Sequence, residues 1–261
     1  MKTRVERLKS IVTEAGEILK EGFKNPKRVY HKGVVDLVTE YDLMIEKHLI
    51  YRLKETFFGY EIVAEESYKN SDYNFNKAII IDPIDGTTNF VHSIPHIAIS
   101  VAVWEDNKPV MGVVYNPILN EMFWAVANEG AYLNDTQIYS SYNKELQNAL
   151  IATGFPYSKV KRGSEYHWVI NTLGKLLPNI QDIRRLGSAA LDICYVAEGK
   201  FDGFYEIGLK PWDTAAAMLV LLEAGGKITS PDGTPYMPTD PIIVASNGYI
   251  HQQLLGYMYN S

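Results

Sequence analysis

Apolar side chains recur at every third or fourth position in two segments near the start of the chain, residues 3–24 and 40–56. This spacing places them on one face of a helix, so both segments are predicted to be amphipathic α-helices. Further along, the pattern changes to short apolar or alternating runs, at 78–81, 97–103, 110–115 and 121–127. Turn residues at Asp106-Asn107 and Asn116-Pro117 separate the last three runs, which predicts an antiparallel meander of strands.

The second half of the chain mixes both patterns. Strands are predicted at 148–153, 201–205 and 242–245, and helices at 164–177, 188–198, 214–224 and near the C-terminus. The dipeptide Gly225-Gly226 would end the third of these helices, because glycine readily adopts the left-handed conformation after a helix. Strands and helices do not alternate strictly, which favours an α/β (α+β) fold of stacked layers. We expect one domain over residues 1–261, with a possible subdomain boundary in the irregular stretch 136–147.

Composition excludes several classes of protein. Of the 261 residues, 46 % are hydrophobic and 21 % are charged, which is typical of a globular chain. The 25 basic residues form no run and are outnumbered by 31 acidic ones, so we expect no direct binding of nucleic acid. No apolar run approaches the roughly 18 residues of a membrane span, and the first residues are charged. The only cysteine, Cys194, cannot form an internal disulfide and is predicted to be buried and inert, which fits a cytoplasmic protein.

The strongest local signal is the segment 79–89, in which an apolar run of three isoleucines leads into Asp82-Pro83-Ile84-Asp85-Gly86-Thr87. Aspartate is depleted in strands, so a carboxylate that ends an apolar run usually lies in a loop, where functional groups concentrate. A simple turn is the alternative, because Asp-Pro and Asp-Gly are common turn dipeptides. Two carboxylates across such a bend can converge on one hard cation, with the carbonyl of Ile84 as a further ligand. The residues from Gly86 to Thr88 could also start a helix, where backbone N–H groups bind phosphate.

Two other metal or phosphate chemistries are disfavoured. Phosphatases with an aspartyl nucleophile carry Asp-x-Asp-Gly-Thr, whereas this chain has one more residue between the two acids, which breaks the period-two geometry. His92 and His96 have the spacing of helical zinc ligands, but Pro95 interrupts that helix.

Three further acids each have a simple structural explanation. Glu65 belongs to a pair of adjacent acids typical of a surface, Asp42 follows Thr39 at the spacing of a capping box, and Asp213 stands near a helix start. Together with Asp82 and Asp85, however, they all lie at the ends of apolar elements, and such ends form clefts in layered folds. Five carboxylates in one cleft would repel one another unless cations were bound, and magnesium is the natural choice.

Four segments together resemble the inositol monophosphatase family: Asp82–Val91, Glu65-Glu66-Ser67, Asp36–Asp42 and Trp212-Asp213. The resemblance covers essentially the whole chain. It implies a five-layer αβαβα sandwich, and a magnesium-dependent, lithium-sensitive phosphatase with two or three Mg²⁺ ions per site. It also implies a small sugar or inositol phosphate as substrate and a homodimer.

The resemblance assigns roles to single residues. The metal ligands would be Glu65, Asp82, the carbonyl of Ile84, Asp85 and Asp213, and the attacking water would be oriented by Glu65, Thr87 and Asp42. Substrate would be contacted by Asp85, Gly86, Thr87, Gly187, Ser188, Ala189, Glu206 and Asp213. The chain departs from the family at two positions: Ala217 replaces a frequent glycine, and Lys32 is one residue too close to Asp36 to be assigned a catalytic role.

The predicted reaction is hydrolysis of inositol monophosphate to myo-inositol and phosphate by water activated between two metal ions. Alternatives on the same scaffold are fructose-1,6-bisphosphatase, 3′-phosphoadenosine 5′-phosphate phosphatase and histidinol-phosphatase activity. A different class of function is also open, since some bacterial relatives associate with the transcription machinery. The presence of all the metal-binding acids argues against a purely regulatory protein.

Overall fold

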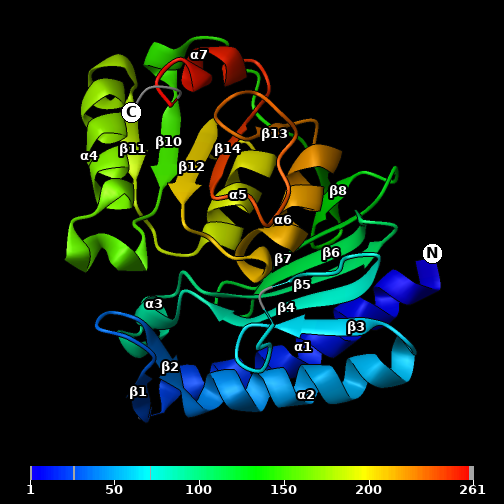
Figure 1. Ribbon diagram of the computed structural model, residues 1–261. Helices are drawn as coiled ribbons and strands as arrows, with labels where there is room; N and C mark the ends of the chain where they lie inside the picture. The colour runs from blue at the N-terminus through cyan, green and yellow to red at the C-terminus, as the bar shows by residue number, and fades with distance from the viewer. Residues whose placement is uncertain (1, 26, 71, 259–261) are drawn as a thin grey trace.

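The helices and strands form five layers in the order α, β, α, β, α (Figure 1). The computed structural model describes residues 2–25, 27–70 and 72–258. Helices α1 (Lys2–Lys24) and α2 (Glu40–Thr56) cover one face of a seven-stranded sheet, and α5 (Ala189–Ala197) and α6 (Pro211–Glu223) cover the other. A five-stranded sheet follows, and its outer face carries α4 (Ser164–Leu176) and α7 (His251–Leu255). The predicted five-layer sandwich is therefore confirmed.

The seven-stranded sheet contains the predicted meander. Its strands, in spatial order, are β3 (Glu61–Ala64), β4 (Lys77–Asp85), β5 (Ala98–Glu105), β6 (Lys108–Asn116), β7 (Glu121–Val126), β8 (Ala131–Leu133) and β9 (Thr136–Ile138). All neighbours from β4 to β9 are antiparallel, whereas β3 lies parallel to β4. Asp106 and Asn107 both have positive φ, as a two-residue hairpin between twisted strands requires. The sequence did not predict β8 and β9.

The five-stranded sheet has the order β11 (Asp182–Arg184), β10 (Leu150–Thr153), β12 (Gly203–Ile207), β14 (Ile242–Ser246) and β13 (Lys227–Thr229). Two predicted strands are shifted in the structure. The strand predicted at 148–153 begins at Leu150, because Leu146–Asn148 forms a 3-10 turn, η1. The strand predicted at 201–205 extends to Ile207, because β12 pairs with β14 that far, and Glu206 consequently lies inside the strand rather than after it.

Five further short elements of the described residues lie outside both large sheets. Strands β1 (Val29–His31) and β2 (Leu37–Thr39) form a small antiparallel hairpin, and the segments η2 (Tyr157–Lys161) and η3 (Leu177–Asn179) flank α4. α3 (Thr87–Val91) follows β4 directly. None of the helices in the described ranges is long and apolar enough to cross a membrane.

Each interface between layers has its own hydrophobic core. In β4, Ile79 and Ile81 contact the layer of α1 and α2, while Ala78 and Ile80 belong to the core around α5 and α6. This alternation is the two-residue period of a strand that is buried on both faces. The buried Cys194 lies in the same central core, as predicted.

Helix α6 is buried on almost every side because it lies between the two sheets. It begins at Pro211, three positions before the predicted start, since proline is well suited to the first turn of a helix. Its C-terminal Gly225 has positive φ, as predicted. The backbones of α6 and β6 nearly touch: a Cβ atom added to Gly112 would lie 2.6 Å from the carbonyl oxygen of Ala216.

Candidate active site

A cavity of about 490 Å³ opens where β4, β12 and the first turns of α5 and α6 meet. Almost all residues that the sequence assigns to the site line this cavity: Glu65, Asp82, Ile84, Asp85, Gly86, Thr87, Gly187, Ser188, Ala189, Glu206 and Asp213. The exception is Asp42, which is fully buried behind the wall. Elements that are far apart in sequence therefore bring the predicted residues together.

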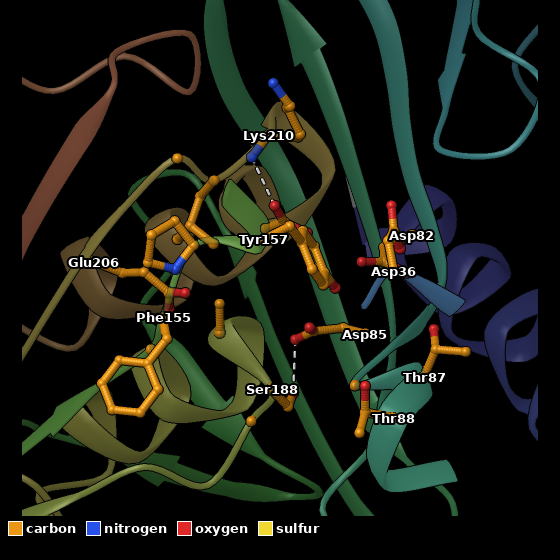
Figure 2. Close-up of a pocket in the computed structure, with 18 of the residues that line it drawn as sticks. Asp36, Asp82, Asp85, Thr87, Thr88, Phe155, Tyr157, Ser188, Glu206 and Lys210 are labelled. Atoms are coloured by element: carbon orange, nitrogen blue, oxygen red, sulfur yellow. Dashed lines mark hydrogen bonds between the residues drawn. The ribbon is translucent and has the colours of Figure 1, made fainter. Parts of the chain in front are cut away.

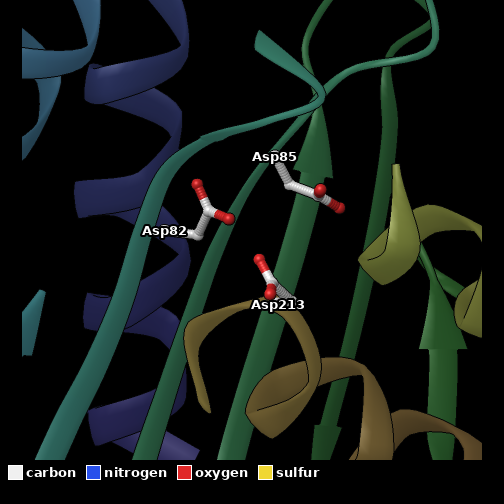
Figure 3. A group of neighbouring side chains, drawn as sticks. All are labelled: Asp82, Asp85 and Asp213. Atoms are coloured by element: carbon white, nitrogen blue, oxygen red, sulfur yellow. The ribbon is translucent and has the colours of Figure 1, made fainter. Parts of the chain in front are cut away.

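Strand β4 supplies two of the acids. The strand does not end at Ile81, as the sequence suggested, but continues through the motif: Asp82 pairs with Ser100 of β5, and Asp85 pairs with Ala98. The register shifts between these two pairs, because the stretch on β4 is longer by one residue than its partner on β5. The predicted loop is thus an irregular strand end. Its bulge places both carboxylates close to that of Asp213 at the start of α6 (Figure 3).

The three aspartates form a compact group in which carboxylate oxygens of Asp82, Asp85 and Asp213 lie within 4.8 Å of one another (Figure 3). Each aspartate uses one oxygen for hydrogen bonds that hold it in place. The donors are the Ile84 N–H to Asp82 (3.0 Å), the Ser188 hydroxyl and Ala190 N–H to Asp85 (2.6 and 2.7 Å), and the Lys210 N–H to Asp213 (2.6 Å). The second oxygen of each accepts no hydrogen bond from an N–H or hydroxyl group of the described residues, and the Asp82 carboxylate also lies against that of Glu65. These oxygens are available to a cation.

The charges in this group are mutually unfavourable. Burial, together with the neighbouring carboxylates, raises the pKa of Asp82 and of Asp213 well above the ordinary value. Burial also raises the pKa of Asp85 to about 6, although the hydrogen bonds from Ser188 and Ala190 oppose the shift. No lysine, arginine or histidine of the described ranges forms an ion pair with these aspartates. A set of oxygen ligands with unbalanced negative charge fits a hard divalent cation.

Glu65 lies beside this group with a different partner. The Nζ atom of Lys32 is 2.8 Å from Glu65 Oε1 and 2.6 Å from Glu66 Oε1. Burial alone would lower the pKa of Lys32, but the two glutamates outweigh it and the net shift is upward. Burial and the charge of Glu65 raise the pKa of Glu66 to about 7. Lys32, to which the sequence assigned no role, thus enters the cavity from the loop of the β1–β2 hairpin.

Thr87 connects the cavity to Asp42. Its hydroxyl lies 3.2 Å from Asp42 Oδ1 and 3.0 Å from the carbonyl oxygen of Ile84, and can donate its single proton to one of them at a time. Asp42 Oδ2 accepts hydrogen bonds from the N–H and the hydroxyl of Thr39, so the predicted capping box is confirmed. Burial raises the pKa of Asp42 to about 6. Asp42 therefore reaches the cavity only through its contact with Thr87.

Glu206 lies at the opposite end of the cavity from Asp82. Figure 2 shows Glu206 and Phe155 on one side and Asp36 and Asp82 on the other. The Glu206 carboxylate packs directly against Gly154, where any side chain would clash with it. Burial, and then the charge of Asp213, raise the pKa of Glu206 well above the ordinary value. In the described part of the chain it has no hydrogen-bond partner, so it is available to a ligand.

Several lining residues were missed by the sequence reasoning: Gly154, Phe155, Pro156, Tyr157, Lys159 and Arg185. A signal for the first four was present, because the apolar strand β10 runs into Gly-Phe-Pro much as β4 runs into Asp-Pro. The sequence predicts that His92 and His96 do not lie on one helix, and the structure agrees. α3 ends at Val91, before His92, and His96 is paired with Asp192 at 3.1 Å.

Residues 2–261 match the sequence profile of the inositol monophosphatase family. The chain belongs to this family. "Inositol monophosphatase 2" of Solanum lycopersicum is 37 % identical over 253 residues, which cover 95 % of each chain. "Nus factor SuhB" of Escherichia coli is 39 % identical over 248 residues, or 94 % of this chain and 91 % of the relative. The solved structure of extragenic suppressor protein suhB from Bartonella henselae matches with a TM-score of 0.91 at 33 % identity, over 98 % of both chains.

Membership of the inositol monophosphatase family confirms the resemblance seen in the sequence and indicates a metal-dependent phosphatase. The group of Asp82, Asp85 and Asp213 could hold the metal. The two relatives carry different names, one for an inositol monophosphatase and one for a Nus factor. Family membership therefore indicates the class of reaction and leaves the substrate to be argued from the cavity.

Proposed function

We propose that this protein is a Mg²⁺-dependent hydrolase of small phosphate monoesters, which converts inositol monophosphate, or a similar sugar phosphate, to the free polyol and phosphate. The observation that carries the proposal is the group of three carboxylates, from Asp82, Asp85 and Asp213, within 4.8 Å of one another at the cavity wall. Like charges this close disfavour their own ionised state unless a cation neutralises them. A bound cation would also attract the phosphate of a substrate.

The metal ligands in this proposal are Asp82, Asp85, Asp213, Glu65 and the carbonyl of Ile84, for two or three magnesium ions. When bound, the ions would supply the positive charge that lowers the pKa of a water molecule and stabilises the leaving alkoxide. Hard oxygen ligands without histidine or cysteine favour magnesium over zinc. No covalent intermediate is required.

Thr87 and Asp42 would orient the attacking water, with Glu65 as a third contributor. If the Thr87 hydroxyl donates its proton to Asp42, its oxygen can accept a hydrogen bond from water in the cavity. Asp42 remains in position because its second oxygen accepts two hydrogen bonds from Thr39. The water is thus held by a side chain that is itself held by the buried start of α2.

Contacts to the rest of the substrate would come from both ends of the cavity. The N–H groups of Gly86 and Thr87 would donate to the phosphate, and Gly187, Ser188 and Ala189 would lie beside the polyol. Glu206 would accept hydrogen bonds from polyol hydroxyls, because its carboxylate has no other partner among the described residues. A buried polar group of this kind discriminates strongly against analogues that lack the matching hydroxyl.

The proposal is tested by a phosphate-release assay on four esters: inositol 1-phosphate, fructose 1,6-bisphosphate, 3′-phosphoadenosine 5′-phosphate and histidinol phosphate. We expect hydrolysis of inositol 1-phosphate that requires magnesium, stops in excess chelator and is inhibited by lithium. Full turnover in chelator would contradict the metal mechanism. Hydrolysis of none of the four would reject the reaction, whereas a clear preference for another ester would change only the substrate.

The relatives named Nus factor SuhB favour a second candidate function, association with the transcription machinery. Affinity purification with the wild-type protein and with an inactive Asp213→Asn variant would separate this role from catalysis. Recovery of RNA polymerase subunits with both proteins would support an independent association, and recovery with neither would contradict it. We also propose a homodimer, to be measured by light scattering after size-exclusion chromatography.

A further inference from the structure

A buried histidine–aspartate pair that the proposed reaction does not use lies beside the cavity. The Nε2 atom of His96 is 3.1 Å from Asp192 Oδ1, and the two residues are 8 % and 2 % exposed. Asp192 belongs to α5 and lines the cavity, whereas His96 lies just before β5 and does not. An apolar pair of the same size would usually hold two elements together equally well, which points to a role in fixing positions rather than in stability.

The first turn of α5 holds Asp85. The Ser188 hydroxyl donates to Asp85 Oδ2 at 2.6 Å (Figure 2), and the Ala190 N–H donates to the same oxygen at 2.7 Å. Ser188 is also the N-cap of α5, where its hydroxyl oxygen accepts a hydrogen bond from the Leu191 N–H at 3.3 Å. Since Oδ2 is fixed in this way, the direction of the other carboxylate oxygen depends on where the first turn of α5 lies.

Three segments of backbone meet next to this turn. The Asn89 side chain donates to the carbonyl oxygens of His96 and Leu186, at 2.8 Å each. A Cβ atom on Gly86 would lie only 3.1 Å from the carbonyl oxygens of Gly187 and His96. The end of the aspartate motif, the segment before β5 and the segment before α5 therefore pack backbone against backbone, so a shift of one segment displaces the others.

The side chain of His96 links this junction to the body of α5. Its partner Asp192 lies one turn after Ser188, and the Asp192 N–H donates to the Ser188 carbonyl oxygen at 2.9 Å. The His96 ring also contacts the ring of Tyr195 edge-on, with 5.5 Å between the centroids. Two contacts along one helix restrain its rotation about its own axis. Rotation of α5 would move both hydrogen-bond donors of its first turn, and with them the carboxylate of Asp85.

We propose that His96 and Asp192 are positioning residues for Asp85: their pair fixes the first turn of α5, and thereby the carboxylate oxygen of Asp85 that would bind Mg²⁺. This inference rests on the proposed function, in which Asp85 is a metal ligand. Loss of a partner that orients a metal ligand commonly weakens metal binding about 10- to 100-fold. Because the pair acts one contact further from the metal, we expect the lower end of this range.

Isothermal titration calorimetry with Mg²⁺ alone tests the inference in the absence of substrate. His96→Phe keeps a ring against Tyr195 but removes the nitrogen that faces Asp192, and should raise the Kd for Mg²⁺ about 10-fold. His96→Asn, whose amide is too short to reach Asp192, should give the same rise. His96→Gln can bring an amide N–H close to the position of Nε2, and should keep the Kd within about threefold of the wild-type value.

Asp192→Asn distinguishes the position of this side chain from its charge. The amide oxygen can still accept a hydrogen bond from His96, whereas the negative charge is lost, so we expect a Kd for Mg²⁺ within about threefold of the wild-type value. A rise as large as that in His96→Phe would overturn the inference, because the charge of Asp192 would then be responsible. At saturating Mg²⁺, kcat of His96→Phe on inositol 1-phosphate should stay within about threefold of wild type, while half-maximal activity requires about 10-fold more Mg²⁺.

A second buried histidine provides a matched control. His251 is 1 % exposed, is hydrogen-bonded to Thr229 and Ser246 at 2.9 and 2.8 Å, and does not line the cavity. In excess chelator, both His96→Phe and His251→Phe should lower Tm, because each loses a buried polar contact. Only His96→Phe should weaken Mg²⁺ binding. An unchanged Kd in His96→Phe, or an equal rise in His251→Phe, would overturn the inference. A wild-type protein that binds no Mg²⁺ would instead reject the metal site of the proposed function.

Discussion

The two ends of the cavity are built in different ways. At the aspartate end, each carboxylate projects from strand β4 or from the first turn of helix α6 and is hydrogen-bonded to backbone or to Ser188. The opposite end, which we call the distal wall, is lined by Gly154, Phe155, Lys159, Arg185 and Glu206. It depends on the 3-10 segment η2, where Tyr157 is 61 % exposed, and on Arg185, which is exposed as well. Figure 2 shows Tyr157 between Glu206 on one side and Asp82 on the other.

This difference indicates that the aspartate end serves the chemical step, whereas the opposite end serves the choice of substrate. Carboxylates that are fixed by strand β4 and helix α6 cannot shift without disturbing the central core, so this end suits steps common to all substrates. Exposed side chains on a short irregular segment can be replaced at little cost in stability. We therefore expect substitutions at the aspartate end to lower the turnover of every ester, and substitutions at the distal wall to act on particular ones.

The largest effect is expected from Asp213→Asn. The variant keeps the shape of the side chain and a hydrogen-bond acceptor for the Lys210 N–H, but loses a negative charge at the metal group. Removing several kcal/mol of transition-state stabilisation should lower kcat by about 100-fold or more on all four esters. Turnover and thermal stability should be measured together, with Asp232→Asn as an exposed control. Near-normal activity would mean that Asp213 serves only the start of α6.

Thr87→Ala should have a smaller but equally general effect. Loss of the hydroxyl would leave the water unoriented and lower kcat by about 10- to 100-fold on all four esters, as seen for residues that position a metal-site group. Magnesium affinity, measured by calorimetry, should change little, and Thr87→Ser should restore most of the activity. If turnover is unchanged, Thr87 is only the first residue of α3.

Glu206→Gln tests whether the end of the cavity at Glu206 discriminates between esters with and without a polyol hydroxyl. We expect turnover of inositol 1-phosphate to fall about 10-fold more than that of p-nitrophenyl phosphate, which has no hydroxyl for Glu206 to bind. Gly154→Ala provides an independent variant, because a methyl group there would displace the Glu206 carboxylate. Equal losses on both esters would remove the distinction between the two ends.

The smallest effect concerns stability in the absence of metal. The pKa values of Asp42 and Asp85 are raised to about 6 in the folded protein, so these groups hold protons more tightly folded than unfolded. Their contribution to stability is present below their ordinary pKa and is lost as the pH rises through about 6. In excess chelator, Tm should fall by a few degrees between about pH 5 and about pH 7.

Magnesium should reduce this fall in Tm, since in the proposed site it would neutralise the carboxylate of Asp85 at the higher pH. Scanning fluorimetry with chelator and with magnesium measures both curves. Asp85→Asn should flatten the curve in chelator, whereas Asp135→Asn, at an exposed position, should not. A Tm that rises over this pH range in chelator would contradict the raised pKa values.

Much of the fold could be predicted from the sequence, because long elements have long apolar patterns. Helices α1 and α2 and the strands β4 to β7 each bury a periodic set of side chains. Strand β1 shows no such pattern because Val29, Tyr30 and His31 are all exposed. β11 and β13 are three residues long, which is too short for a period to be recognised.

The candidate site was predictable where its residues are adjacent in sequence. Asp82 and Asp85 stand in one contiguous motif, Asp213 stands near a predicted helix start, and the family resemblance then supplied Glu206. Apart from Glu206, the distal wall was not predictable, since it forms only when β10 and β12 pair in parallel and bring Gly154 to Glu206. The ion pairs of Lys32 likewise depend on how the β1–β2 hairpin folds back over Glu65.

The close approach of Gly112 to Ala216 limits which mutations of Gly112 the protein can tolerate. Gly112 does not line the cavity, yet it touches the helix one turn beyond Asp213. Any mutation of its codon that adds a side chain would push α6 away from β6 and shift Asp213 relative to Asp82 and Asp85. Selection on catalysis should therefore act on a codon whose residue does not line the cavity, and a variant there would resemble a variant of the active site itself.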